Sequence, residues 1–433
     1  MNDARIVFMI YLIVMCIMRI EPLTFDKEKK LTSERSHKSG HRKKLPQIFG
    51  DSFDVHAPDF IQLVSKHGYP AEEHLVTTAD GYKLKIHRIP GSPTHPKAPG
   101  KPIVYFQHGL LASSDCWVLF GPEKDLTFMM ADAGFDVWVG NIRGNTYSRS
   151  HVSLDPDYDH EFWQYSWHEM GIYDIPAIID HILDLTGERG LIYVGHSMGT
   201  TISYVLLSIK PEYNDKIWLA VSFAPVAIWT APPSYTIKLL KLHSEDVRTF
   251  IYAAGVYEIM PRTKELTHLI EKSCGHRNSF HPMCLDNLWT SPGHEPQLLN
   301  ESIVPYIYSF FPAGTSRQTL EHFHQNIDTG DFTMFNYSPG GNLDHYGQSH
   351  PPRYNLKKII THVALYYGAS DALAPPQNSI TLAEHLPNVA VLKRVDDDHF
   401  NHYDFLVAKD IKLVLNNPVL HMVTNFLERR RAQ

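Results

Sequence analysis

One short stretch of the sequence predicts a serine at the tip of a tight turn between a strand and a helix. The apolar residues 191–194 precede the pentapeptide Gly-His-Ser-Met-Gly of residues 195–199, and residues 200–207, which are expected to form a helix, follow it. Glycines at both ends of such a turn let backbones approach closely around a strained apex. The apex, Ser197, then stands at the amino end of a helix, whose free N–H groups favour a developing negative charge. The pattern predicts a nucleophilic serine.

A serine hydroxyl is a weak nucleophile at neutral pH, so the chain must also supply a base and a group that orients the base. In α/β-hydrolases the acid and the histidine follow the serine in that order. A buried parallel strand is predicted at residues 363–368, and Asp371 lies in the loop after it. The next apolar stretch, residues 389–395, leads into a loop with two histidines, His399 and His402. Spacing alone does not choose between them.

Two backbone N–H groups are expected to bind the oxyanion that forms when such a serine attacks a carbonyl. One belongs to the residue after the serine, here Met198, and the other to a loop after an early strand. Residues 103–106 read as this strand, and residues 107–114 follow it as a loop that a His-Gly pair turns. We call residues 107–114 the oxyanion loop and expect the N–H of Leu110 to face the serine.

Several longer segments resemble the acid lipases, the family that includes gastric and lysosomal acid lipase and many insect homologues. The resemblance covers about residues 53–429 and rests on the segments 54–70, 77–82, 87–90, 107–114 and 136–148. The family's catalytic histidine lies in an Asn-His-x-Asp-Phe motif, which is here residues 401–405. The resemblance therefore selects His402 over His399, and it implies Ser197 as nucleophile and Asp371 as acid.

The same resemblance implies an α/β-hydrolase fold, with a mostly parallel central sheet and a helical cap or lid insertion. Between about residues 227 and 352, strand–helix alternation fades and clustered Pro, Gly and aromatic residues replace it, which suits an apolar cover over the serine. We expect a signal peptide at 1–20, a basic disordered segment at 21–52, a first part of the core at 53–226, a cap at 227–352 and a second part of the core at 353–433.

The residues and the resemblance together predict a serine lipase that hydrolyses neutral lipid esters at a lipid–water interface. The resemblance implies triacylglycerols as substrates, with cholesteryl esters as the alternative, whereas the three side chains alone do not distinguish these from short soluble esters. The acyl-enzyme mechanism needs neither a metal nor an organic cofactor. The alternatives are a non-catalytic lipid carrier or storage protein, an esterase for soluble short-chain esters, a peptidase or thioesterase, and a metal-dependent hydrolase. The last would use His276, His281 or the loop 396–402. An intact serine, acid and histidine argue against the carrier.

The charge and the amino-terminal residues limit the partners and the location. A net charge of −7 over 433 residues provides no basic face for nucleic acid. Residues 6–18 form an apolar run that suits a signal sequence and is short for a membrane span. No clear cleavage site follows, so an uncleaved anchor stays an alternative. We expect a secreted or lysosomal protein without a stable membrane span and without an obligate protein partner.

Cysteines and sequons predict covalent modifications in the insertion. Cys274 and Cys284 flank two histidines, which leaves a zinc site as an alternative, but a disulfide is the simpler outcome in an oxidising compartment. The resemblance implies a cap disulfide at a similar place. Asn300 and Asn336 begin Asn-x-Ser sequons, which predicts N-glycosylation at both. Cys116, after the oxyanion loop, is expected to be a small buried apolar residue.

Overall fold

The computed structural model describes residues 44–45, 57–231, 251–265, 267–268 and 303–432. The predicted signal peptide, nearly all of the basic segment, Cys274, Cys284, Asn300 and the two histidines between those cysteines lie outside these ranges. Within them, no helix is both long and apolar enough to cross a bilayer.

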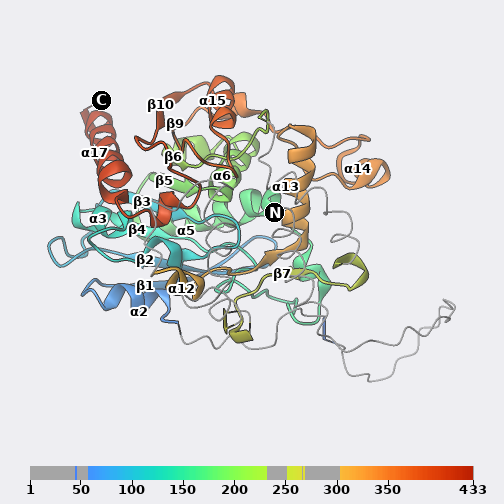
Figure 1. Ribbon diagram of the computed structural model, residues 1–433, viewed down its shortest axis with the longest axis horizontal. Coiled ribbons are helices and arrows are strands. Elements are labelled where there is room, and N and C mark those ends of the chain that lie inside the picture. Colours follow the sequence, from blue (N-terminus) through green and yellow to red (C-terminus); the bar gives the residue numbers. More distant parts are fainter. Residues whose placement is uncertain (1–43, 46–56, 232–250, 266, 269–302, 433) are drawn as a thin grey trace, which may run out of the picture.

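An eight-stranded, mostly parallel sheet forms the centre of the fold (Figure 1), in the order β1-β2-β4-β3-β5-β6-β9-β10. β2 pairs antiparallel with both β1 and β4, and every other neighbouring pair is parallel. The strands are β1 (Glu72–Thr77), β2 (Lys83–Ile89), β3 (Ile103–Gln107), β4 (Asp136–Val139), β5 (Leu191–His196), β6 (Ile217–Phe223), β9 (His362–Tyr367) and β10 (Val389–Arg394).

Helices cover both faces of the sheet. Alternate residues of β5 point to opposite faces: Tyr193 belongs to one buried apolar cluster and Val194 to the other. The first cluster includes α4 (Trp167–Glu169), α5 (Ile175–Thr186), α6 (Met198–Ile209) and α15 (Pro376–His385), and the second includes α2 (Phe60–Ser65), α3 (Leu126–Asp132), α16 (Asp404–Val407) and α17 (Asn417–Ala432). Because the central strands are buried on both faces, their sequences are continuous apolar runs, and such runs can be recognised from the sequence alone.

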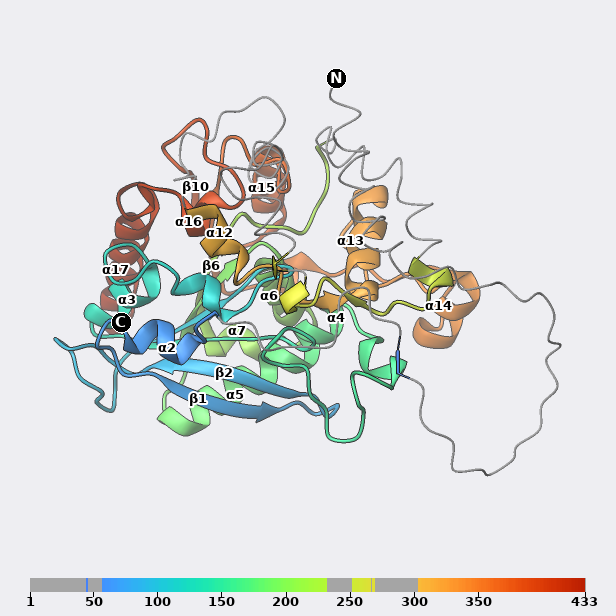
Figure 2. The same cartoon turned by 60° about the horizontal axis from the view of Figure 1, so that its bottom comes forward.

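Residues 224–361, which we call the insertion, separate β6 from β9. Their described elements are β7 (Glu258–Ile259), α12 (Val304–Tyr308), β8 (Thr315–Ser316), α13 (Arg317–Thr329), α14 (Ser338–Tyr346) and the 3-10 turn η5 (Leu356–Lys358). β7 and β8 pair as a separate two-stranded sheet. Figure 2 shows α13 and α14 on the opposite side of the molecule from α17, with β1 and β2 along its lower edge.

The elements predicted from apolar runs are present. The four predicted strands correspond to β3, β5, β9 and β10, and the predicted helix to α6, with ends that differ by at most two residues. Shorter pieces complete the chain: η1 (Ser114–Trp117), η2 (His160–Trp163), η3 (Met170–Asp174), α7 (Tyr213–Lys216) and η6 (Lys412–Asn416). A mostly parallel sheet with helices on both faces confirms the predicted α/β fold class.

Candidate active site

Ser197 occupies the turn between β5 and α6 in a backbone conformation that side chains rarely adopt, with φ 54° and ψ −121°. The two glycines around it make this turn feasible. A Cβ on Gly195 would lie 2.8 Å from the backbone of Gly199, and a Cβ on Gly199 would lie 2.4 Å from the carbonyl oxygen of Gln107. The turn therefore packs directly against the end of β3, and only glycine fits at either position.

The structure brings His402 and Asp371 to this serine. The Nε2 atom of His402 lies 2.8 Å from the Oγ of Ser197, and its Nδ1 lies 2.9 Å from the Oδ2 of Asp371. The Asp371 carboxylate is fully buried, and its Oδ1 accepts hydrogen bonds from the N–H groups of Leu373 and Ala374. Because the carboxylate accepts a hydrogen bond from Nδ1–H, the proton stays on Nδ1, and Nε2 is left as the acceptor that faces the serine hydroxyl.

The second histidine of the same loop stands apart from this arrangement. His399 is exposed, and its backbone N–H donates to Asp397. Of the two histidines that spacing did not separate, the structure brings His402 and not His399 to Ser197.

A buried histidine that sequence reasoning passed over supports the loop of His402. The side chain of His196, the residue before the serine, is in contact through Nε2 with the carbonyl oxygen of His402 at 2.9 Å. Burial, together with any positive charge on His402, lowers the pKa of His196 to about 3. His196 is therefore neutral at physiological pH, and its Nε2–H acts as a fixed donor to the loop. The sequence contained a hint of this role, because His196 is the second residue of the pentapeptide 195–199, but that motif allows any residue at this position.

An apolar cavity of about 530 Å³ opens in front of Ser197. The insertion supplies much of its wall, and the remainder comes from the core and from the loop of His402. Apolar lining residues include Leu119, Val226, Trp229, Ile259, Ile307, Phe310, Leu320, Leu373 and Leu406. Three charged or titratable side chains of α13 also reach it, namely Arg317, Glu321 and His324. The Arg317 guanidinium lies over the ring of Tyr252, 3.7 Å from its centre.

The two residues expected to supply oxyanion N–H groups flank the serine. Met198 is buried at the first position of α6, and Leu110 lines the cavity together with Ser197. Gly109 brings the oxyanion loop close, because a Cβ there would lie 3.0 Å from the Cβ of Ser197. Cys116 is a free thiol on the cavity wall and is half-buried rather than fully buried. Burial raises the pKa of this thiol well above its ordinary value.

Asn336 lies on the surface of the insertion. It is exposed, and its Oδ1 accepts hydrogen bonds from the N–H of Ser338 and the side chain of Asn342. N-glycosylation there remains a prediction.

Two asparagines after β4 hold the oxyanion loop, and the sequence analysis did not assign them a role. The Oδ1 of Asn141 accepts from the N–H of Ser114 and from Nδ2 of Asn145, both at 2.8 Å. The Nδ2 of Asn145 lies 3.1 Å from the Nε2 of the buried His108. Both asparagines belong to the segment 136–148, whose resemblance to the acid lipases marked it as a segment of interest. No local sequence pattern indicated what these two side chains contact.

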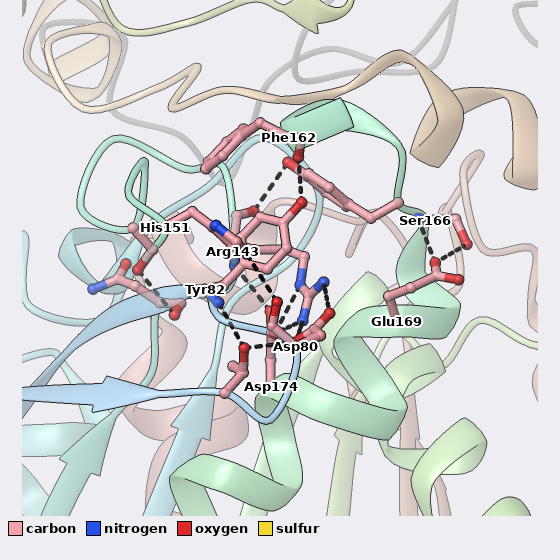
Figure 3. A network of polar contacts seen from close by, with 12 residues as sticks. Asp80, Tyr82, Arg143, His151, Phe162, Ser166, Glu169 and Asp174 are labelled. Carbon is pink, nitrogen blue, oxygen red and sulfur yellow. Dashed lines mark hydrogen bonds and ion pairs between the residues drawn. The ribbon is translucent and has the colours of Figure 1, made fainter. Parts of the chain in front are cut away.

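A buried ion network around Arg143 holds the segment 136–148 (Figure 3). The Arg143 side chain is 1% exposed and forms ion pairs with Asp174 at 2.6 Å and Asp80 at 2.7 Å. Burial alone would lower the pKa of Arg143, but the two carboxylates raise it above its ordinary value. The guanidinium also lies 3.9 Å from the ring centre of Tyr82. The network joins the β1–β2 turn, the loop after β4 and the start of α5.

Comparison with known proteins finds lipases among the relatives of this chain. Residues 60–121 match the family described as a partial alpha/beta-hydrolase lipase region, and residues 102–406 match the alpha/beta hydrolase fold family. Lipase member K of Mus musculus is 37% identical over 369 residues, which are 85% of this chain and 91% of that protein. Human gastric triacylglycerol lipase is 36% identical over 84% of this chain and 90% of its own length.

An insect relative and a more distant solved structure extend the comparison. Lipase 3 of Drosophila melanogaster is 37% identical over 84% of this chain and 92% of its own length. The crystal structure of a putative lipase from Sulfolobus solfataricus has a TM-score of 0.52 over 82% of this chain and 99% of that chain, at 12% identity, and so shows a shared fold. On these matches over most of its length, the chain belongs to the acid lipase family of α/β-hydrolases, among the relatives of gastric triacylglycerol lipase and lipase member K.

Proposed function

We propose that this protein is a serine lipase that hydrolyses the ester bonds of neutral lipids, triacylglycerols first, with cholesteryl esters as a second class. One observation carries the proposal: the Ser197 hydroxyl lies 2.8 Å from the Nε2 of His402 at an apolar cavity. Relatives that match over nine-tenths of their length include proteins named gastric triacylglycerol lipase. Apolar walls favour acyl chains, because each CH₂ group gains by leaving water.

The reaction follows from the roles of the three side chains. Ser197 attacks the ester carbonyl while His402 takes its proton, and the Asp371 carboxylate orients and stabilises the resulting imidazolium. The N–H groups of Leu110 and Met198 bind the oxyanion of the tetrahedral intermediate. His402 then gives its proton to the leaving alcohol, which leaves an acyl-enzyme. A water molecule, activated by His402, releases the fatty acid and restores the serine.

The cap of this proposal comprises residues 227–352, which make up most of the insertion, between core parts 53–226 and 353–433. Its side chains wall the cavity, which excludes water from the acyl-enzyme. A disulfide between Cys274 and Cys284 and glycans on Asn300 and Asn336 belong to the same proposal of a secreted or lysosomal enzyme, and the exposure of Asn336 supports the last of them.

Hydrolysis of a long-chain triacylglycerol emulsion and of a soluble short-chain ester, measured from pH 4 to pH 8 for the wild type and Ser197→Ala, tests this function. We expect emulsion hydrolysis in the wild type and none in the variant. Activity on the soluble ester alone would reassign the protein as an esterase. No hydrolysis of either substrate, with lipid binding intact in both proteins, would indicate a carrier.

A further inference from the structure

The insertion contacts the oxyanion loop at a strained position. Leu111 has a left-handed backbone with φ 59°, which a residue with a branched side chain rarely adopts. Its carbonyl oxygen accepts a hydrogen bond of 2.7 Å from the N–H of Ala313, a residue of the insertion. The carbonyl of Ala313 in turn accepts from the N–H of Thr146 at 2.8 Å. Ala313 therefore joins the oxyanion loop to the loop after β4.

A second contact lies at the other end of the oxyanion loop. Asp115, the residue after the loop, has a fully buried carboxylate, and Arg262 of the insertion donates to it at 2.9 Å. Tyr147 and Ser113 donate their hydroxyl protons to the same carboxylate at 2.7 and 3.0 Å. A buried carboxylate needs an opposite charge, and removing one partner of such a pair leaves an uncompensated charge in the interior. Arg262 supplies that charge from the insertion.

Both contacts lie just after the residue whose N–H is expected to face the serine. Leu110 lies directly before Leu111, and Asp115 lies four residues beyond it. Both anchors of the insertion also stand beside the cavity, because Ile259 lies three residues before Arg262 and Phe311 two residues before Ala313, and both line it. The insertion thus covers the cavity and holds the backbone that borders it.

A second buried ion pair between the insertion and the core serves as a control for the pair of Arg262 and Asp115. Arg149, in the loop after β4, pairs with Glu258 of β7 at 2.9 Å and with Asp157 at 2.6 Å. These partners lie outside the oxyanion loop. The Arg149 and Glu258 side chains are each 9% exposed, close to the 11% of Arg262. The two pairs match in chemistry and burial and differ in which part of the core they hold.

We propose that Arg262, together with the Ala313 N–H, positions the oxyanion loop from the insertion, so that the oxyanion hole is complete only while this part of the insertion is seated on the core. Arg262 is a positioning residue for the reaction proposed above, and the inference rests on that function. It acts through Asp115 and the loop backbone rather than on the substrate. A misplaced oxyanion donor weakens binding of the transition state and not of the ground state, so kcat falls while KM stays nearly constant.

The test compares Arg262→Met with Arg149→Met on a soluble short-chain ester, with active-site titration and thermal unfolding of each variant. We expect kcat of Arg262→Met to fall about tenfold or more, because losing one oxyanion donor outright costs roughly 10²- to 10³-fold in kcat. Its KM should stay within about twofold, and Arg262→Lys should recover most of the lost kcat. Arg149→Met should keep kcat within about twofold.

If the unpaired Asp115 charge destabilises Arg262→Met, a double variant still allows the positioning role to be tested. Asp115→Asn combined with Arg262→Met removes both charges together and should fold, yet keep a kcat at least about fivefold below that of the wild type. Unchanged kcat in a folded Arg262→Met or double variant would overturn the positioning role. Equal losses in Arg149→Met and Arg262→Met would also overturn it, since general attachment of the insertion would then explain both. An inactive wild type would instead overturn the lipase proposal itself.

Discussion

The Nε2 atom of His402 lies 2.8 Å from the Oγ of Ser197, although 205 residues separate them in the chain. The two side chains come from different elements: Ser197 from the turn after β5, and His402 from the loop between β10 and α16. Both segments follow strands of the parallel part of the sheet, which has β6 and β9 between β5 and β10, so they meet at the same edge of the sheet. This relationship underlies the predictions below.

His402→Gln should abolish ester hydrolysis, and His399→Gln should leave it within about twofold of the wild type. Glutamine has a similar length but cannot take a proton, and only His402 faces the serine. Initial rates on a soluble ester, corrected for folded protein by circular dichroism, check this. Loss of activity in His399→Gln, with activity retained in His402→Gln, would show that His399 is the base and that the assignment to His402 is wrong.

Asp371→Asn should lower kcat by about 10⁴-fold, because the amide no longer holds the Nδ1 proton of His402 and the wrong tautomer then faces the serine. Asp396→Asn is the matched control. Asp396 is a nearby aspartate that is 72% exposed and pairs with Lys393, so its loss should not alter kcat. Steady-state kinetics of both variants give the comparison, and equal rates for the two would exclude Asp371 as the orienting group.

Gly199→Ala should destabilise the protein and reduce activity, because the new Cβ would lie 2.4 Å from the carbonyl oxygen of Gln107. Such overpacking costs about 1–3 kcal/mol of the free energy of unfolding, and the displaced backbone leads into the oxyanion loop. Gly340→Ala, in α14, meets no atom within 4 Å and should raise stability by about 0.5–1 kcal/mol through helix propensity. Denaturant unfolding measures both, and equal effects of the two changes would contradict the packing of the turn.

Acid should destabilise the protein partly through His87. Burial, followed by the charges of Lys85 and His74, lowers the pKa of His87 from 6.5 to about 3 in the folded state. Its ring stacks on Phe60 at 4.3 Å, and its Nδ1 contacts Ser114 at 2.8 Å. As the pH falls, the unfolded chain binds this proton at a higher pH than the folded protein does, because its pKa is higher. The contribution of His87 to stability is therefore complete above pH 6.5 and is lost as the pH falls toward 3.

At pH 4.5 this loss amounts to about 2–3 kcal/mol, since each pKa unit corresponds to about 1.4 kcal/mol. His87→Gln does not titrate, so its free energy of unfolding should fall by about that much less than the wild type's between pH 7.5 and pH 4.5. Urea unfolding of both proteins at the two pH values checks this. An identical pH dependence in wild type and variant would mean that His87 is protonated in the folded state.

The fold was largely predictable because its signals are local. The apolar run before Gly195 and the helix pattern after Ser197 each indicate an element on their own, and the segments that resemble acid lipases supplied the family, which the comparisons confirm. The order of strands follows from that family rather than from any pattern in the chain.

The contacts that shape the site were not predictable in the same way. Spacing could not separate His399 from His402, and the pairing of Arg262 with Asp115 spans 147 residues. His196, Asn141 and Asn145 are polar residues buried by tertiary packing, and nothing in their neighbours along the chain shows which donor or acceptor each one meets. Such contacts depend on where strands end relative to one another, which local propensity does not encode.

The most direct test of the account is covalent labelling with an alkyl p-nitrophenyl phosphonate, followed by peptide mass spectrometry. A phosphonate reacts with an activated serine and leaves a stable tetrahedral adduct whose oxygen occupies the oxyanion position. We predict one adduct per molecule on the peptide that contains Ser197, loss of ester hydrolysis in proportion to labelling, and no adduct in His402→Gln at the same exposure. Labelling at another residue, or full hydrolytic activity in a protein whose Ser197 is completely modified, would contradict the account.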